Sequence, residues 1–123
     1  IIAMWHRPRW GSGAHRDSKK PRWFWNEMYA ARGELIVNGH AHHYERFAPQ
    51  TPEGTADAER GLRQFVVGTG GMNAYVFGPT LPNSEVREAG TYGLMKLTLE
   101  DGAYAWEFLA VGGGVRDQGN VKT

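Results

Sequence analysis

Histidines concentrate near the start of the sequence, and their spacing is compatible with metal chemistry. All 5 histidines of the 123-residue chain fall in its first 43 residues, at His6, His15, His40, His42 and His43. Neutral imidazole is a common ligand for zinc, iron and similar ions. Alternate residues of an extended segment share one face, so His40 and His42 could bind one metal or two neighbouring ones. Ordinary surface histidines explain so short a pattern equally well. The predicted elements around the histidines must therefore show whether a metal site is plausible.

Two predicted strands would carry histidines to the same edge of a sheet. The apolar run 1–5 ends at His6, and the apolar run 34–38 ends at Gly39 and His40. Both runs are typical of strands buried on both faces. We expect glycine at position 39 to permit the unusual backbone angles that a strand-end metal loop needs.

A charged loop and one helix separate these two strands. The loop spans residues 7–20, and Pro21 suits the first turn of a helix predicted over 21–32. Gly33 stands where a C-terminal cap belongs. The apolar face consists of Trp23, Phe24, Met28 and Ala31, with Glu27 at the same spacing. Strand, loop, helix and strand thus form an α/β unit with both histidine-bearing ends on one edge.

The rest of the chain is predicted to be mostly antiparallel strands and loops. Residues 48–62 are typical of a surface loop, and 63–67 of a third strand. Residues 72–89 carry no regular pattern. Alternation over 95–110, interrupted by an Asp-Gly turn, predicts a β-hairpin. Residues 115–123 show no periodic signal, and we expect a tail or connector there.

Composition excludes several classes of protein. Lys and Arg total 14 against 13 Asp and Glu, so the net charge of +1 indicates neither nucleic acid nor an anionic membrane as partner. No apolar run approaches the roughly 20 residues of a membrane span. The chain has no cysteine, which excludes thiolate metal sites and disulfides but leaves the compartment open, secretion and the cell envelope included. The length suits one domain or a piece of one.

One segment resembles a known family. Residues 39–46, Gly-His-Ala-His-His-Tyr-Glu-Arg, resemble the Gly-His-x-His-x-Tyr-Glu-Arg signature of purple acid phosphatases and related calcineurin-like metallophosphoesterases. Residues 3–8 resemble the earlier strand-end histidine motif of that family, and 64–71 its later strand and glycine turn. The resemblance implies the C-terminal half of a four-layer α/β/β/α sandwich, with a strand-helix-strand unit, antiparallel strands and a terminal hairpin.

The resemblance also implies a dinuclear metal centre that hydrolyses phosphate esters. His6 and His40 would bind one metal and His42 the other, with Fe, Zn or Mn as di- or trivalent ions. His15 lies nine residues after His6, where the family has a histidine implicated in substrate binding or in protonating the leaving group. A solvated loop histidine is the alternative for His15.

Four further residues are candidates for binding the phosphate or orienting the metal ligands. Arg7 and Arg16 could hold the phosphate, since guanidinium groups match its oxygens, although a solvated loop also explains them. Glu45 and Arg46 could orient the imidazoles or pair with each other. His43 has no ligand role in the pattern, and we expect it in a pocket wall or at the surface.

Several ligands of the family are missing from the sequence. None of its N-terminal motifs, such as Gly-Asp-x-x-Asp or Gly-Asn-His-Glu, occurs here. We therefore expect residues 1–123 to be the C-terminal part of one catalytic domain, with an N-terminal half upstream as its partner. By itself the chain should hydrolyse an aryl phosphate negligibly.

Two alternatives to this assignment remain open. The chain could be a non-catalytic half that completes a site only with a separate N-terminal chain. Metallo-β-lactamase-type and histidine-triad hydrolases fit less well, because residues 40–45 lack the aspartate of the first class and the strict alternation of the second.

Overall fold

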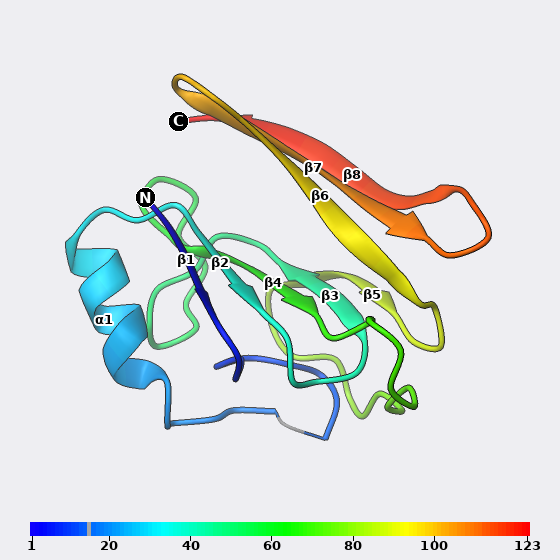
Figure 1. Ribbon diagram of the computed structural model, residues 1–123. Coiled ribbons are helices and arrows are strands. Elements are labelled where there is room, and N and C mark those ends of the chain that lie inside the picture. The colour runs from blue at the N-terminus through cyan, green and yellow to red at the C-terminus, as the bar shows by residue number, and fades with distance from the viewer. Residues whose placement is uncertain (15) are drawn as a thin grey trace.

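The computed structural model describes residues 1–14 and 16–123, which form two β-sheets and one helix (Figure 1). The elements are β1 (Ile2–Trp5), α1 (Arg22–Ala30), β2 (Leu35–Asn38), β3 (Tyr44–Phe47), β4 (Arg63–Val67), β5 (Ser84–Glu88), β6 (Gly93–Glu100), β7 (Ala103–Ala110) and β8 (Val115–Lys122). The predicted α/β class, with a strand-helix-strand unit followed by antiparallel strands, is confirmed. Within the described residues, no helix is long and apolar enough to cross a membrane.

The larger sheet has the strand order β1-β2-β4-β3-β5, and the smaller one has β6-β7-β8. Strands β1, β2 and β4 are parallel, whereas β3 pairs antiparallel with both β4 and β5. The last residues of β1 and β2, Trp5 and Asn38, are paired in the register. Both strands therefore end at the same edge of the sheet, as the sequence predicts.

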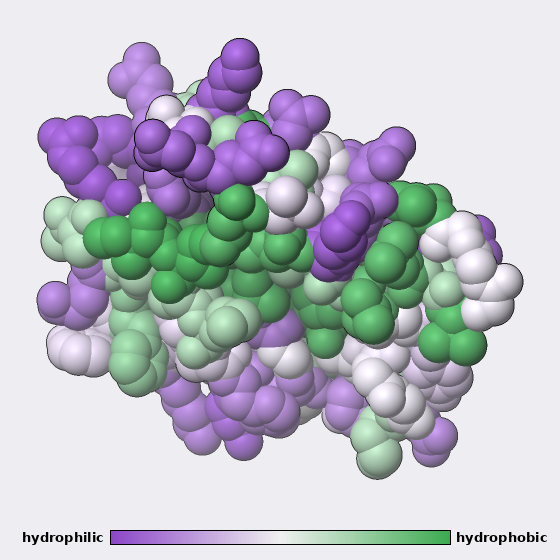
Figure 2. Space-filling model, turned by 45° about the horizontal axis from the view of Figure 1, so that its top comes forward, coloured by the Kyte–Doolittle hydropathy of each residue, from purple (hydrophilic) through white to green (hydrophobic). Residues whose placement is uncertain are grey.

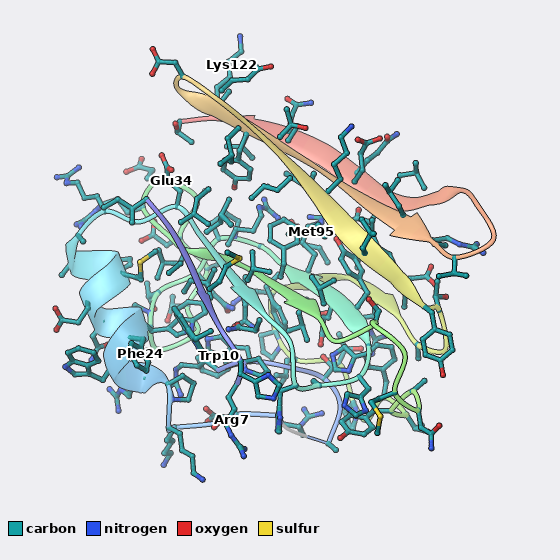
Figure 3. All side chains as sticks on the ribbon, viewed as in Figure 1. Arg7, Trp10, Phe24, Glu34, Met95 and Lys122 are labelled. Atoms are coloured by element: carbon teal, nitrogen blue, oxygen red, sulfur yellow. The ribbon has the colours of Figure 1, made fainter. Side chains whose placement is uncertain are left out.

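The main hydrophobic core lies between the two sheets, where side chains fill the space seen in Figure 3. Its buried members are Leu35, Tyr44, Phe65, Tyr104, Trp106 and Phe108. The Tyr44 and Phe108 rings stack with their centroids 4.1 Å apart. On the other face of the larger sheet, Trp25 of α1 packs with Ile36 and Leu62. The helix thus covers one face and the smaller sheet covers the other.

Three strands differ from the sequence prediction. The expected tail at 115–123 is wrong, because β8 pairs with β7 over most of its length. Part of the supposedly irregular stretch 72–89 forms β5, and β3 lies inside the histidine motif. These strands are rich in polar residues, so apolar alternation does not reveal them. Backbone pairing forms them instead: β8 pairs with β7, β3 with β4, and β5 with β3.

The end of α1 also differs in detail from the prediction. The left-handed residue is Arg32, with φ 55°, and not Gly33. The amides of Arg32 and Gly33 donate to the carbonyls of Tyr29 and Met28, which is the hydrogen-bond pattern of a Schellman ending. A Cβ at Gly33 would displace the flexible end of the Met28 side chain and approach the Met28 carbonyl to 3.0 Å.

A buried carboxylate on β8 joins the two sheets. Asp117 accepts hydrogen bonds from Tyr44 Oη (2.6 Å), Arg46 Nε (2.7 Å) and Trp106 Nε1 (3.1 Å). Burial raises the pKa of Asp117, but the hydrogen bonds from Arg46 and Tyr44 outweigh burial and leave the pKa below its usual value. The ionised form is therefore favoured in the folded state.

Asp117→Asn should destabilise the protein by about 3 kcal/mol, because it removes the buried carboxylate partner of Arg46 and leaves that cation with only the partly exposed Glu85. The free energy of unfolding in urea measures the loss. Lys96→Ala is the control, since Lys96 and Glu107 form an exposed pair whose loss should cost about 0–1 kcal/mol. Equal effects of both variants would contradict a special role for Asp117.

The same carboxylate makes stability depend on pH. Its pKa is lower in the folded than in the unfolded state, so the unfolded chain binds more protons in acid. The stabilisation is present above the unfolded pKa of about 3.9 and is lost as the pH falls through the folded pKa. The urea midpoint of Asp117→Asn should accordingly fall less between pH 5 and pH 3 than that of the parent protein.

Candidate metal centre

His6 and His40 meet at the shared end of β1 and β2. Two contacts fix the backbones: Asn38 Nδ2 donates to the Trp5 carbonyl at 2.9 Å, and the Gly39 amide donates to the His6 carbonyl at 3.1 Å. Beyond them, His40 Nδ1 lies 3.1 Å from His6 Nε2, with the two rings edge to face. The parallel register thus brings together two imidazoles that are 34 residues apart in sequence.

This pair has the geometry to share an ion. The two nitrogens are 3.1 Å apart, a separation at which both could bind one ion. His6 would bind through Nε2 and His40 through Nδ1. The observed separation fits one metal held by both residues.

The sequence predicts the unusual backbone angle of this loop at Gly39, but it occurs at His40. His40 has φ 59°, in the left-handed region that residues with a Cβ rarely occupy. Such strain costs about 1–3 kcal/mol and is concentrated at functional sites. Here the left-handed turn accompanies the close approach of the His40 ring to His6.

His42 is held separately, with one ring nitrogen already engaged. Its Nδ1 lies 3.0 Å from the Asn73 carbonyl, which can only accept, so this nitrogen carries the proton. Metal-binding histidines commonly have this second contact, which leaves Nε2 for the ion. The Tyr75 ring stacks on His42 with centroids 4.2 Å apart, and the Tyr75 amide donates to the His42 carbonyl. The ring contact restrains the imidazole, and the backbone hydrogen bond holds the two segments together.

All three predicted ligands line one hollow of about 460 Å³. The other residues around it are Val67, Gly68, Gly70, Gly71 and Met72. The predicted glycine turn after β4 therefore forms one wall. Gly68 is essential to it, because a Cβ there would overlap the Ala41 carbonyl.

The two predicted phosphate-binding arginines lie beside a neighbouring hollow of about 240 Å³, which His40 also lines. Arg7 Nη1 lies 3.4 Å from His40 Nε2, and Arg16 Nη1 donates to the Pro79 carbonyl at 2.5 Å. Both cations thus stand next to the histidine pair. His15, the predicted catalytic residue, lies outside the described residues.

Glu45 is fully buried, and the histidine that it contacts is His43. It accepts hydrogen bonds from the Ser12 amide (2.7 Å), Ser12 Oγ (2.5 Å) and Ser84 Oγ (2.6 Å), and His43 Nε2 lies at 3.1 Å. Burial raises the pKa of Glu45, but the hydrogen bonds from His43, Ser12 and Ser84 lower it below its usual value overall.

Two expectations about neighbouring residues require correction. His43 is not a surface residue, because only 1% of it is exposed and it packs against Phe77. Arg46 does not pair with Glu45, because successive residues of a strand point to opposite faces. It instead pairs with Asp117 and Glu85. Arg46 thus joins the two sheets, and Glu45 faces the loops near the histidines.

The donor set of the described residues is incomplete for a metal centre. Across residues 1–14 and 16–123, no three His, Asp or Glu side chains come close enough together to hold an ion. His6 and His40 form a pair, and His42 stands apart in the same hollow. Additional ligands are needed to complete either site.

Several residues at the site could not be found from sequence. Ser12, Asn73, Tyr75 and Ser84 contact Glu45 or His42 from segments without a periodic pattern. The only signal was their position in two long irregular stretches, which are often functional.

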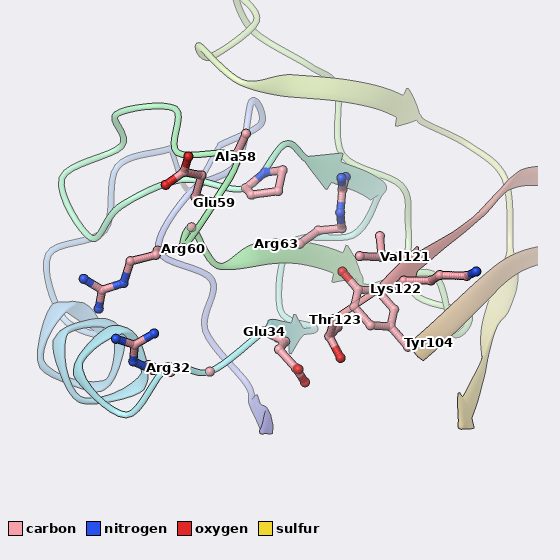
Figure 4. A pocket seen from close by; sticks show the side chains of 13 residues that line it. Arg32, Glu34, Ala58, Glu59, Arg60, Arg63, Tyr104, Val121, Lys122 and Thr123 are labelled. Atoms are coloured by element: carbon pink, nitrogen blue, oxygen red, sulfur yellow. The ribbon is translucent and has the colours of Figure 1, made fainter. Parts of the chain in front are cut away.

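A larger hollow, of about 650 Å³, lies elsewhere on the molecule (Figure 4). The residues around it come from the segment just before β2, from the loop before β4 and the first residue of β4, from the start of β7 and from the end of β8, and none is a histidine. Its charged side chains have both signs: Arg32, Glu34, Glu59, Arg60, Arg63 and Lys122. In Figure 3, Glu34 lies at the far end of the sheet from Arg7. This larger hollow is thus separate from the candidate metal centre, which lies at the end of the sheet that carries the histidines.

Two solved structures share this fold. Purple acid phosphatase PPD1 from yellow lupin (Lupinus luteus) seeds matches with a TM-score of 0.81 and 21% identity, over 98% of this chain and 24% of its own. GAP50, the anchor in the inner membrane complex of Plasmodium, matches with a TM-score of 0.77 and 16% identity, over 99% of this chain and 36% of its own. No protein-family model and no curated protein matches the sequence.

The predicted resemblance is thereby confirmed at the level of fold. Nearly all of the chain superposes on part of the metallophosphoesterase fold. It spans well under half the length of either matching structure. These identities establish the fold and leave activity to experiment.

Zn²⁺ binding should depend on the histidines unequally. His6→Ala and His40→Ala should each weaken the same binding event by at least about tenfold, because each removes one of two nitrogens from a shared ion. His42→Ala should leave that event unchanged and weaken a different one. Isothermal titration of the intact protein with Zn²⁺ distinguishes the two binding events. An identical effect of all three variants would contradict the assignment to two metals.

Proposed function

We propose that this chain is the histidine-bearing part of a metal-dependent phosphoesterase. The observation that carries the proposal is the 3.1 Å approach of His6 Nε2 and His40 Nδ1, with His42 lining the same hollow. Two di- or trivalent ions, Fe, Zn or Mn, would be held by His6 with His40 and by His42. Bound metals lower the pKa of water to generate a nucleophile and stabilise charge on phosphoryl oxygens.

The basic residues at the site would bind the substrate. Arg7 and Arg16 lie beside His40, where their guanidinium groups can donate to the oxygens of a phosphate ester. The carbonyl of Pro79 orients Arg16. His15 keeps its role from the family resemblance, protonation of the leaving oxygen.

The missing ligands would come from a polypeptide segment outside residues 1–123, as the N-terminal half of the same domain. Among the described residues, β1 pairs only with β2, so its other edge is open to a further strand. Met4 is 77% exposed although it lies on the same face of β1 as Ile2, which packs in the core. The open edge therefore exposes apolar surface.

The smaller sheet exposes an apolar residue at its own edge. Leu99 of the edge strand β6 shares a face with the core residues Met95 and Leu97, yet it is 58% exposed. Figure 2 shows hydrophobic side chains in a band across the molecule, between hydrophilic groups on either side. A segment that extends the sheets and covers these residues would complete both the core and the metal site.

The alternative is a non-catalytic half that works only with a separate N-terminal chain. The incomplete donor set of the described residues is compatible with it. Mass analysis of the native protein distinguishes the two: one longer chain supports a single catalytic domain, and a tightly bound second chain with Asp and Asn motifs supports a split one.

The intact protein should hydrolyse an aryl phosphate when loaded with Zn²⁺, Mn²⁺ or Fe²⁺. Arg7→Ala should raise KM by about tenfold, because a charge-assisted hydrogen bond to the phosphate is lost. Steady-state kinetics measure this change, with Arg87→Ala as a control on β5. The absence of metal-dependent turnover in the intact protein would refute the proposed function.

The open edge makes a separate prediction. In the intact protein, Met4→Asp should lower the free energy of unfolding by about 2–3 kcal/mol, because it would bury a charge beneath the completing segment. Val111→Asp is the matched control, an exposed apolar residue in the β7–β8 turn, and should change it by less than about 0.5 kcal/mol. Urea unfolding measures both. Similar small effects would mean that β1 remains uncovered.

A further inference from the structure

Glu45 connects three segments that lie far apart in sequence. Its two oxygens accept hydrogen bonds from Ser12, in the loop after β1, and from Ser84, at the start of β5, while Glu45 itself belongs to β3. Ser12 and Glu45 are both fully buried. A buried carboxylate needs such donors, because it has no water to replace them. These contacts therefore hold the loop after β1 in one place.

Ser12 passes this restraint on to the segment 72–81, which we call the wall segment. The Leu81 amide donates to Ser12 Oγ at 3.0 Å, and the Gly78 amide donates to the Ser12 carbonyl at 2.8 Å. Arg16 binds the Pro79 carbonyl in the same region. One serine thus links Glu45 to two points of the wall segment.

The other end of the wall segment shapes the histidine hollow. Met72 lines the hollow, the Asn73 carbonyl fixes His42 Nδ1, and the Tyr75 ring stacks on His42. A displacement of the wall segment would move all three. The loop lies closely against His43, because a Cβ added at Gly13 would approach the His43 ring to 3.0 Å.

We propose that Ser12 and Glu45 form a latch that positions the wall segment against His42, and with it Arg16 beside the phosphate-binding hollow. Neither residue touches the metal or the substrate, so both are positioning residues. The consequence for substrate binding rests on the proposed function. The latch itself is a property of the chain and can be tested without activity.

Two serine variants separate the latch from a general loss of packing. Ser12→Ala and Ser84→Ala each remove one hydroxyl donor to Glu45 Oε1, but only the Ser12 hydroxyl also binds the wall segment. Ser84 contacts the wall segment through its backbone amide, which donates to the Leu81 carbonyl at 3.3 Å and remains in the variant. The readout is hydrogen exchange in the intact protein at the Tyr75 and Gly78 amides. Their acceptors, the His42 and Ser12 carbonyls, remain in both variants.

Ser12→Ala should accelerate exchange at Tyr75 and Gly78 by about tenfold or more, while Ser84→Ala changes it less than about twofold. The Phe108 amide in β7 serves as an internal reference and should stay unchanged. Unchanged protection at Tyr75 and Gly78 would overturn the proposal. Equal acceleration at Phe108, or in Ser84→Ala, would overturn it too, because the effect would then be global.

Binding of inorganic phosphate gives the second readout. Ser12→Ala should raise the phosphate Kd of the Zn²⁺-loaded protein by about tenfold, because Arg16 loses its placement. Zn²⁺ binding by His6 and His40 should stay the same. Glu45→Gln, which keeps the side-chain shape, should reproduce the exchange result. If the exchange result holds and phosphate does not bind, the latch stands and the proposed function fails.

Discussion

The parallel pairing of β1 with β2 is the constraint on which the site depends. Because Trp5 and Asn38 are opposite each other in the register, both strands leave the sheet at one edge and deliver His6 and His40 together. An antiparallel arrangement would send the two histidines to opposite edges. The left-handed backbone of His40 then completes the approach of the two rings.

Strand β3 joins this edge to the rest of the molecule because its two faces have different partners. Tyr44 and Arg46 point to the smaller sheet, where both donate to Asp117. Glu45, between them, points the other way and receives Ser12. One short strand therefore combines two buried carboxylate networks, one that holds the sheets together and one that holds the loops around the histidines.

Much of the fold could be predicted because local patterns encode it. Buried strands 1–5 and 34–38, the amphipathic helix and the hairpin 95–110 all have clear apolar spacing. Strand β8 has no such signal: it is stabilised by its backbone pairing with β7 and by Asp117. The roles of Arg46 and His43 were missed for a related reason, since their partners Asp117 and Phe77 are distant in sequence.

By itself, the sequence determined which residues could bind metal and which strands carry them, because residue type and apolar periodicity are local properties. Only the tertiary structure decided that the His6 and His40 rings lie 3.1 Å apart while His42 contacts Asn73 and Tyr75 instead. It also decided that Glu45 accepts hydrogen bonds from Ser12 and Ser84. These outcomes depend on strand register and on hydrogen bonds between distant loops, which no spacing along the chain encodes.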